Sequence, residues 1–491
     1  MNKDRNASSR KTFDPAKLQA LLEHLSRLLP EQNERQAFYA CSQTPPPASL
    51  RLNPLQFQFQ SLRPHLRQLG HPVPWCEDAF ALPESEKGLG QMLEHAMGAF
   101  YVQAKAPMLA VEVLAPQPGE RVLDLCAAPG GKSIQIAAHM KNSGLLLVNE
   151  MLSKRMPSLV GNLERCGVAN YIVTQTPGAM LSRYFHNFFD RILLDAPCSG
   201  DGIVRKDQNM LDYWSPQDAE NLAQQQIGLL RAAYHMLKPG GTMVYSTCSL
   251  SLEENEAVLL GLLRRHAADV EILPIDAYQN QPLPDEISKQ YPADFSRCVR
   301  IWPHHHDTEG AFIAHLRKRV STTHANVEGD ADTWETAPAI DAAAAAAKLA
   351  LEHRWQCELP CPPGLVYTLG NRHLTLQPAL GPAIQRHLPY FVRGGMRVAR
   401  HHKGYCYLSQ QTVAQWGHLM QGPSMELTWS QLQAIFQGQP AKLDAATHLK
   451  GEILCRFGRW TVCRAIIQEE GQSLDGMLPR NFFRNVLRTF D

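Results

Sequence analysis

The sequence predicts an α/β protein built on a largely parallel sheet of about seven strands, with a smaller α+β unit before it and a compact domain after it. Between residues 96 and 318, short apolar runs alternate with helical patterns, which is typical of a parallel sheet. The length of 491 residues allows two to four domains. We expect boundaries at 1–95, 96–318, a linker and helix over 319–354, and 355–491.

Composition limits the classes of function. The chain has 48 basic and 47 acidic residues, so nucleic-acid binding would have to come from local patches. Met1–Lys11 is polar, unlike a signal peptide, and no run of 18 apolar residues predicts a membrane span. The twelve cysteines are scattered, and a chain of this size needs no disulfides. We therefore expect a cytoplasmic protein without membrane contact.

The first 95 residues predict a small α+β unit. Leucines at helical spacing between residues 14 and 43 indicate a pair of helices. Ser49–Leu52 indicates a short strand, and Leu55–Leu69 indicates another helix. Three arginines look exposed, namely Arg51, Arg63 and Arg67. They could face RNA or solvent, and for each residue taken singly we favour solvent.

The central region predicts repeated strand–helix units. The expected strands are Arg121–Leu125, Leu145–Asn149, Tyr171–Thr174, Arg191–Leu194 and Thr242–Ser246, with two late strands near Cys298–Ile301 and Ala311–Leu316. One expected helix follows Ser133 and runs through Met140, and three others cover Ser153–Cys166, Pro216–Leu237 and Glu253–His266. Ser251-Leu-Glu-Glu254 has the spacing of a capping box, and Lys238-Pro-Gly-Gly241 indicates a turn. Ligands bind at the carboxyl ends of the strands in such sheets.

The carboxy-terminal third contains a one-sided run of charge. After a linker over 319–340, Ala342–Arg354 predicts a helix, and residues 355–491 mix short strands and turns. No acidic residue lies between Glu358 and Glu426. This run has a formal charge of +6 from Arg372, Arg386, Arg393, Arg397, Arg400 and Lys403, and it also holds five histidines. We favour contact with phosphate over a merely solvated surface.

A glycine loop follows the first central strand. It reads Cys126-Ala-Ala-Pro-Gly130-Gly131-Lys132-Ser133, which matches neither a Walker loop nor the dinucleotide motif. What remains is a small-residue turn before a helix, whose free N–H groups favour an anion such as a carboxylate. Glu150 closes the next strand, where an acid can accept both ribose hydroxyls. S-adenosylmethionine, a nucleoside with a small acidic tail, fits both features.

A carboxylate and two thiols are expected at the same edge. Asp195 and Cys198 follow the strand at 191–194, and Cys248 follows the strand at 242–246. The simpler alternative is an Asp that caps the next element and a Cys in the core. A methyl donor beside two thiols indicates pyrimidine C5 as the acceptor, since thiolate attack on C6 activates C5. Asp195 suits cytosine, because it can accept from N4 and share a proton with N3. Such a base must leave its stack.

Three motifs carry a specific resemblance. They are Leu-Asp-Leu-Cys-Ala-Ala-Pro-Gly-Gly-Lys-Ser (123–133), Asp-Ala-Pro-Cys-Ser-Gly (195–200) and Ser-Thr-Cys-Ser-Leu (246–250), supported by Arg51-Leu-Asn-Pro54 and Gly310-Ala-Phe-Ile-Ala314. On these, residues 45–318 resemble the NOL/NOP/Sun family of RNA cytosine-C5 methyltransferases. The resemblance implies a Rossmann-like sheet of seven strands, S-adenosylmethionine as cofactor, an amino-terminal RNA-binding unit, and a PUA-like RNA-binding domain over 355–491.

The resemblance also implies roles for individual residues. Cys248 is the expected nucleophile, Cys198 assists release of the product, and Asp195 contacts both the cofactor and the target base. The other expected cofactor contacts are Cys126, Ala127, Ala128, Pro129, Gly130, Gly131, Lys132 and Glu150. Pro177 replaces the family's adenine-binding Asp, which leaves that contact to Gln175 or Thr176.

The implied substrate is a cytosine in the decoding region of small-subunit rRNA, either as naked rRNA or in the assembled 30S subunit. We expect a monomer. Two alternatives stay open: the same chemistry on tRNA or another rRNA site, and a non-catalytic RNA-binding assembly factor, which Pro177 favours. We expect no metal, although Cys357 and Cys361 lie four apart and His304–His306 is a triplet.

Overall fold

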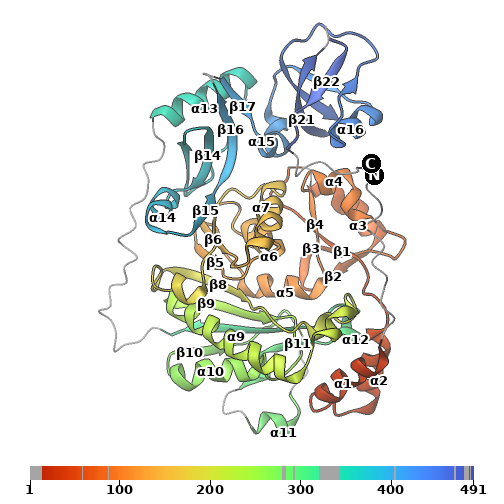
Figure 1. Cartoon of the computed structure of the whole chain (residues 1–491), viewed down its shortest axis with the longest axis vertical. Coiled ribbons are helices and arrows are strands. Elements are labelled where there is room, and N and C mark those ends of the chain that lie inside the picture. Colours follow the sequence, from red (N-terminus) through yellow and green to blue (C-terminus); the bar gives the residue numbers. More distant parts are fainter. Residues whose placement is uncertain are drawn as a thin grey trace.

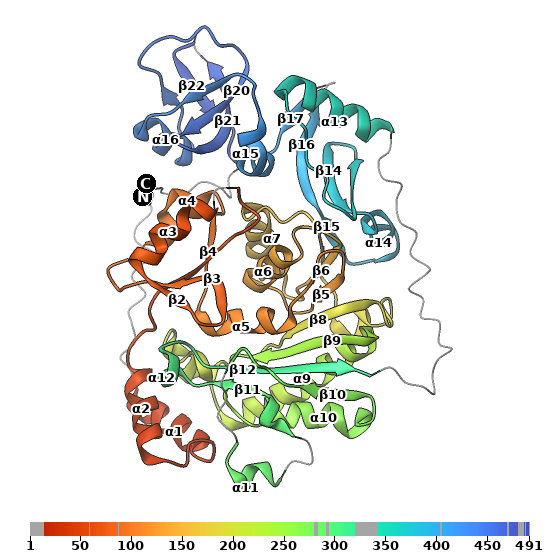
Figure 2. The same cartoon turned by 180° about the vertical axis from the view of Figure 1, so that it is seen from behind.

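The computed structural model describes residues 14–57, 59–86, 88–278, 283–290, 294–319, 342–402, 405–468, 471–479, 486 and 488–490. A large sheet with its helices forms the body, a helix pair lies at one end of the long axis, and carboxy-terminal sheets lie at the other (Figures 1 and 2). None of the helices within these ranges has the length and apolar content needed to cross a membrane. Except for Arg319, the predicted linker at 319–340 lies outside the described residues.

The large sheet has the strand order β10-β12-β9-β8-β5-β6-β7-β15, and β11 pairs with β12. Its strands are β5 (Arg121–Asp124), β6 (Leu145–Asn149), β7 (Tyr171–Thr174), β8 (Phe189–Asp195), β9 (Leu237–Thr247), β10 (Val270–Leu273), β11 (Val299–Ile301), β12 (Ala311–Lys318) and β15 (Phe391–Gly394). Strands β5 to β9 pair in parallel, and the others pair antiparallel. The predicted fold class is confirmed, and β10 and β15 extend the seven predicted strands.

Helices cover both faces of this sheet (Figure 1). One face packs against α5 (Lys105–Leu114), α6 (Gly131–His139) and α7 (Met156–Arg165), and the other against α8 (Gly178–Leu181), α9 (Pro216–Met236) and α10 (Glu256–His266). Successive strand residues alternate between the two cores, as Val122 and Leu123 do. Full burial of each such side chain stabilises the fold by about 1.5–3 kcal/mol. Short helices between these elements are η2 (Ser153–Arg155), η3 (Asp201–Ile203), η4 (Gln208–Asp212), α11 (Asp285–Ser288), η5 (Phe295–Arg297) and α12 (Pro303–His306).

Of two local predictions in this region, the capping box is wrong and the turn is found inside a strand. The predicted capping box does not form: α10 begins at Glu256, and the hydroxyl of Ser251 donates to the buried carboxylate of Asp201 instead. A charged acceptor in the core competes successfully with a helix cap. The predicted turn at 238–241 lies within β9, where the pairing with β8 steps from Phe189–Leu237 to Arg191–Thr242 and Gly240 has a φ of 82°.

The amino-terminal region forms two separate parts. Helices α1 (Pro15–Leu25) and α2 (Gln32–Ser42) are the predicted pair, and they pack against the loops that follow β8 and β9. The remainder is the sheet β2-β3-β1-β4 with its helices: β1 (Ser49–Leu52), α3 (Phe59–Leu69), β2 (His71–Val73), β3 (Cys76–Ala81), η1 (Leu89–Gln91), α4 (Leu93–Ala96) and β4 (Phe100–Val102). The expectation that Arg51 is exposed is wrong. Its side chain is buried, and its guanidinium is satisfied there because it donates to the carbonyl of Gly131 and to the side-chain oxygens of Gln103 and Gln135.

The carboxy-terminal region contains two further sheets. After α13 (Ala342–Trp355), the sheet β13-β14-β16-β17 is built from β13 (Leu365–Leu369), β14 (His373–Pro378), β16 (Met396–His402) and β17 (Tyr405–Leu408), with α14 (Gly381–His387) and α15 (Gln410–Trp416). The second sheet, β18-β20-β21-β22-β19, comprises β18 (Ser424–Glu426), β19 (Ala441–Lys442), β20 (Glu452–Phe457), β21 (Trp460–Gln468) and β22 (Ser473–Gly476), with η7 (Gly417–Leu419) and α16 (Trp429–Phe436).

These sheets are tied to the rest of the chain. Strand β15 lies within the predicted domain 355–491, yet it pairs with β7 of the large sheet. Apolar residues of the last sheet share one core with the sheet around β1. The predicted domain boundaries and the PUA-like character of this region remain predictions.

Candidate active site at the carboxyl edge of the sheet

The ends of β8 and β9 bring two cysteines together. Sγ of Cys198 lies 2.8 Å from Sγ of Cys248, and the backbone N–H of Cys248 donates to Sγ of Cys198 at 3.2 Å. We call these two residues the thiol pair. The strands that carry them are adjacent and parallel, with Asp195 opposite Ser246. The sequence prediction that both thiols lie at one edge therefore matches the observed arrangement.

Glycine at 202 allows this close approach. Its N–H donates to the carbonyl of Cys248 at 2.9 Å, and its own carbonyl accepts from Gly310 at 2.7 Å. A Cβ atom on Gly202 would lie 2.6 Å from the carbonyl oxygen of Cys248. The loop after β8 can therefore lie against the end of β9 only without a side chain at this position.

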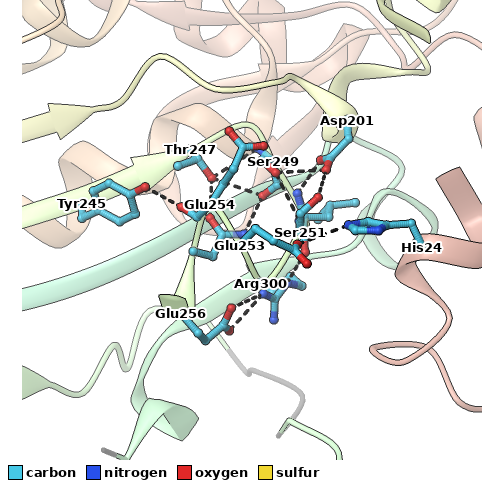
Figure 3. A network of polar contacts seen from close by, with 12 residues as sticks. His24, Asp201, Tyr245, Thr247, Ser249, Ser251, Glu253, Glu254, Glu256 and Arg300 are labelled. Atoms are coloured by element: carbon cyan, nitrogen blue, oxygen red, sulfur yellow. Dashed lines mark hydrogen bonds and ion pairs between the residues drawn. The ribbon is translucent and has the colours of Figure 1, made fainter. Parts of the chain in front are cut away.

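Two buried carboxylates link the loops of the thiol pair (Figure 3). Asp201, on the Cys198 loop, accepts from the backbone N–H of Leu250 and from the hydroxyls of Ser249 and Ser251. Glu254, on the Cys248 side, accepts from the N–H and hydroxyl of Ser199. Each loop is thus held by a carboxylate from the other. We call Asp201 and Glu254 the carboxylate clamp.

Further polar contacts fix the clamp in place. Gln226 of α9 donates to Glu254 and to the carbonyl of Pro197, both at 2.8 Å. The hydroxyl of Tyr245 donates to the backbone carbonyl of Glu254. Behind the loops, Arg300 donates to both carboxylate oxygens of Glu256, and His24 of α1 contacts Glu253 at 3.2 Å (Figure 3).

Burial and neighbours shift the pKa of two groups at this edge. The hydrogen bond with Cys248, followed by burial, raises the pKa of the Cys198 thiol well above its usual value. Cys198 therefore remains protonated at neutral pH. Burial raises the pKa of Asp201 to about 6, against the hydrogen bonds that favour its ionised form. Asp201 is thus mainly a carboxylate at neutral pH and accepts its three hydrogen bonds as an anion.

A cavity opens beside the glycine loop, and we call it the cofactor cavity. Its lining includes most of the cofactor contacts expected from the sequence, namely Cys126, Ala127, Ala128, Pro129, Gly131, Lys132 and Asp195. Gly130 and Glu150 are not part of the lining. Gly130 instead supplies the left-handed turn, with φ of 105°, from which α6 begins.

Charged groups surround the cofactor cavity. Nζ of Lys132 lies 2.6 Å from Oδ2 of Asp195, and Oδ1 of Asp195 accepts from the hydroxyl of Ser246 at 2.8 Å. Burial alone would lower the pKa of Lys132, but Asp195 outweighs it and raises that pKa. Asp124 also lines the cavity, and burial raises its pKa to about 7. Its Oδ1 atom accepts no hydrogen bond from any residue that the structure describes.

Glu150 supports the wall of the cavity. Its two oxygens accept from the backbone N–H groups of Ala128 at 3.3 Å and Leu152 at 2.8 Å. Oε1 keeps a second lone pair, whereas Oε2 also faces the guanidinium of Arg155. Arg155 forms an ion pair with Glu150 at 3.4 Å and donates to the carbonyl of Ala128.

Sequence reasoning missed several residues of this edge. Asp201 and Asp124 lie beside or within the quoted motifs, but spacing gave them no role, and it assigned Glu254 to a capping box. Arg51 holds the start of α6 from a strand about 80 positions earlier, and no local pattern could have indicated that contact. The signal available was its place in the motif Arg51-Leu-Asn-Pro54. Of the two residues expected to replace the family Asp, Thr176 is buried and Gln175 donates to the carbonyl of Met151.

The histidine triplet makes a different contact. Nε2 of His304 and Nε2 of His305 lie 3.1 and 2.7 Å from the same oxygen of Glu34 on α2. These three side chains could hold a metal ion, and no ion is needed to explain the contacts, because the carboxylate accepts from both rings. The triplet thus joins the helix pair to α12. All twelve cysteines, including Cys357 and Cys361, are free thiols.

The parallel sheet and the glycine loop with its cavity define the class of S-adenosylmethionine-dependent methyltransferases. Comparison with known proteins supports this class. A solved methyltransferase homologue from Pyrococcus horikoshii is 31% identical, with a TM-score of 0.53, and the match covers 62% of this chain and 99% of that one.

Family models identify the branch within this class. Residues 111–317 match the 16S rRNA methyltransferase RsmB/F model, and residues 19–105 match the N-terminal domain of 16S rRNA methyltransferase RsmF. The chain belongs to the RsmB/F family of methyltransferases, within the NOL/NOP/Sun group to which its motifs pointed. The predicted resemblance is therefore confirmed.

Curated relatives carry the name ribosomal RNA small subunit methyltransferase F. The relative from Erwinia tasmaniensis is 39% identical over 322 residues, which are 64% of this chain and 65% of the relative. The relative from Salmonella arizonae is 40% identical over 307 residues, which are 61% of this chain and 63% of the relative. The matches thus span somewhat less than two thirds of these relatives' length.

Proposed function

We propose that this chain methylates C5 of a cytosine in small-subunit rRNA, with S-adenosylmethionine as methyl donor. The observation that carries the proposal is the thiol pair beside Asp195 and the cofactor cavity. Two thiols 2.8 Å apart suit a reaction in which one sulfur bonds to the base and the other assists its release. Family membership and the names of the curated relatives support an rRNA substrate.

In this proposal the sulfur of Cys248 attacks C6 of the flipped cytosine, and C5 gains nucleophilic character. After C5 has accepted the methyl group, it loses its proton, and the bond between Cys248 and C6 breaks as the double bond reforms. Asp195 would share a proton with N3 in this proposal, and Ser246 and Lys132, which bind its two oxygens, would hold its carboxylate in place. The raised pKa keeps Cys198 as a thiol, which is a poor nucleophile, so in this proposal Cys248 attacks the base and Cys198 assists product release.

The cofactor cavity fits S-adenosylmethionine. The free Oδ1 atom of Asp124 needs a hydrogen-bond donor, and the ammonium group of this cofactor is one. The amino terminus of α6 and Lys132 would hold its carboxylate, and Glu150 would accept from the ribose. When bound, S-adenosylmethionine supplies an electrophilic methyl group on a sulfonium centre. The replacement of the family Asp by Pro177 leaves adenine to Gln175 or Thr176.

We further propose that the chain acts as a monomer in the cytoplasm, on a cytosine of the decoding region, in naked rRNA or in the assembled 30S subunit. Twelve free thiols suit a reducing compartment.

Labelled methyl transfer to naked 16S rRNA, to 30S subunits and to tRNA tests this proposal. Bisulfite mapping of rRNA from cells with and without the gene would then locate the base. We expect one rRNA cytosine to lose its protection from bisulfite when the gene is absent. Label only in tRNA would support the alternative substrate, and no label in any RNA would contradict the proposal.

A further inference from the structure

The sheet β13-β14-β16-β17 has one covered face and one open face. On the covered face, apolar residues such as Leu374, Leu376 and Met396 pack with α13 and α15. On the open face, the strand register sets His373 opposite Arg400, Arg400 opposite Tyr407, and His402 opposite Tyr405. Residues paired across strands point to the same side of a sheet. Arg397, opposite Thr375, lies on this side too, because of a bulge between it and Arg400.

We call this open surface the basic face. It consists of His373, Arg397, Arg400, His402, Tyr405 and Tyr407. Arg397, Arg400, His402 and Tyr405 are exposed, and Tyr405 is the most open of them, at 64%. The exposed Arg372 lies at one end of the basic face, next to His373.

The positive charge of the basic face is not balanced. Arg372, Arg397 and Arg400 form no ion pair within the part of the chain that the structure describes. Burial, followed by the charges of Arg397, Arg400, Arg393 and Arg372, lowers the pKa of His373. Four guanidinium groups therefore act on one imidazole.

Glu164, the carboxylate that acts on Arg397, is already engaged. Glu164 of α7 forms an ion pair with Arg393, which is largely buried. The expectation that Arg393 is available to phosphate is wrong, because Glu164 neutralises it. Of the other cations in the acid-free run, Arg386 lies on α14 and Lys403 lies outside the described residues. On this sheet, the unpaired charge therefore resides on the basic face and on Arg372.

We propose that the basic face binds the sugar-phosphate backbone of an unpaired segment of the substrate RNA. The inference rests on the proposed function for the presence of an RNA substrate. Guanidinium groups bind phosphate oxygens in a bidentate manner, and an acid-free surface keeps them free to do so. The exposed ring of Tyr405 adds a face on which an unpaired base can stack. Tyr407, whose ring centroid is 6.5 Å away, is half-buried and has the guanidinium of Arg464 over its ring.

The position of the basic face suits an anchor remote from the chemistry. Four strand-to-strand steps separate β8, which leads to Cys198, from β15, which leads into β16. At about 4.8 Å per step, this is roughly 20 Å of sheet. RNA bound here would be held at a distance from the target base. Its contacts would set affinity and salt dependence and would not enter the chemical step.

The test measures RNA affinity against salt for the wild type and for the double variant Arg397→Gln/Arg400→Gln. The matched control is Arg386→Gln, which removes an exposed cation on α14 from the same acid-free run but outside the basic face. Loss of two contacts to a single strand should lower the slope of log affinity against log salt by about 1.4. At low salt we expect affinity to fall roughly tenfold, with the control within about twofold of wild type.

Two more variants separate charge from folding and from stacking. Arg397→Lys/Arg400→Lys keeps the charge and should keep most of the slope of log affinity against log salt. If the glutamine variant had lost binding through misfolding, retained charge alone would not restore this slope. Tyr405→Ala should weaken binding of an unpaired RNA about fivefold or more and leave duplex binding nearly unchanged.

An unchanged salt slope and an unchanged RNA affinity in the double glutamine variant would overturn the inference. This is also the result expected if the basic face binds an acidic protein and not RNA. Methyl transfer by the wild type, measured on the same RNA, tells the two proposals apart. RNA binding that depends on the two arginines, without methyl transfer, would leave the inference standing and contradict the proposed function.

Discussion

The carboxylate clamp and the basic face use charge in opposite ways. Asp201 and Glu254 are fully buried, and each accepts at least three hydrogen bonds from protein groups. Arg397 and Arg400 are exposed and have no ion-pair partner within the described ranges. Buried charge that is fully hydrogen-bonded fixes geometry, whereas exposed charge without a partner remains available to a ligand. Substitutions in the two regions should therefore change different quantities.

The clamp is reciprocal, and this sets it apart from a single buried ion pair. Asp201 comes from the Cys198 loop and holds the Cys248 loop, while Glu254 does the reverse. The position of one thiol relative to the other is thus determined from both sides. On the basic face, in contrast, each arginine can act alone.

The largest effect should come from the thiol pair itself. Cys248→Ala removes the proposed nucleophile, and we expect methyl transfer to fall at least a thousandfold, to the background of a labelled-methyl assay. Cys361→Ala, which removes an exposed cysteine elsewhere, should retain full activity. Activity of Cys248→Ala within tenfold of wild type would rule out this sulfur as the nucleophile.

Cys198→Ala should separate bond formation from release. Since Cys248 is intact, attack on C6 can proceed, but the group proposed to assist elimination is absent. We expect a covalent complex of protein and RNA that persists on a denaturing gel, with turnover reduced by about a hundredfold or more. The double variant Cys198→Ala/Cys248→Ala should form none. A Cys198→Ala enzyme that turns over normally without an adduct would assign Cys198 another role.

Changes in the carboxylate clamp should have intermediate effects. Glu254→Gln and Asp201→Asn each replace an anionic acceptor with an amide that also presents donors to its neighbours. Such a loss costs about 1–3 kcal/mol, so we expect turnover to fall by about ten- to a hundredfold. The fall should appear in kcat, with little change in the salt slope of RNA binding, because the basic face is intact.

The matched control for the clamp is Glu253→Gln. This carboxylate is adjacent to Glu254 but contacts His24 of the helix pair and not the Cys198 loop. Its activity should stay within about threefold of wild type. Equal losses in Glu253→Gln and Glu254→Gln would show that the clamp has no special role in positioning.

The sequence was sufficient for the strands and for the edge of the sheet. Alternating apolar runs and helical patterns are local signals, so the seven predicted strands and the loops with Cys126, Cys198 and Cys248 are found as expected. The pattern Ser251-Leu-Glu-Glu254 misled, because its groups bond across the sheet edge, to Asp201 and Ser199, and not to their own helix.

Contacts between distant segments were not accessible from the sequence. The burial of Arg51, the engagement of Arg393 by Glu164 and the addition of β15 to the sheet each join residues that are far apart in the chain. Charge counting could locate the acid-free run, but only the strand register shows which of its cations share one open face.

The contact between His24 and Glu253 is intermediate in burial between the carboxylate clamp and the basic face. Of the effects predicted here, its effect on stability should be the smallest. The hydrogen bond with Glu253 raises the pKa of His24, and the same bond lowers the pKa of Glu253. The stabilisation from His24 is therefore complete below its unfolded value of 6.5 and is lost as pH rises through its raised pKa. The stabilisation from Glu253 is present above 4.5 and is lost as pH falls through its lowered pKa. Because both side chains are partly exposed, we expect the contact to stabilise the fold by less than about 1 kcal/mol.

Hydrogen exchange of α1 should quicken by a few-fold between pH 6 and pH 8.5, relative to the intrinsic rate, and His24→Gln should abolish this difference. An equal pH response in His24→Gln would show that the helix pair is held by its apolar contacts alone.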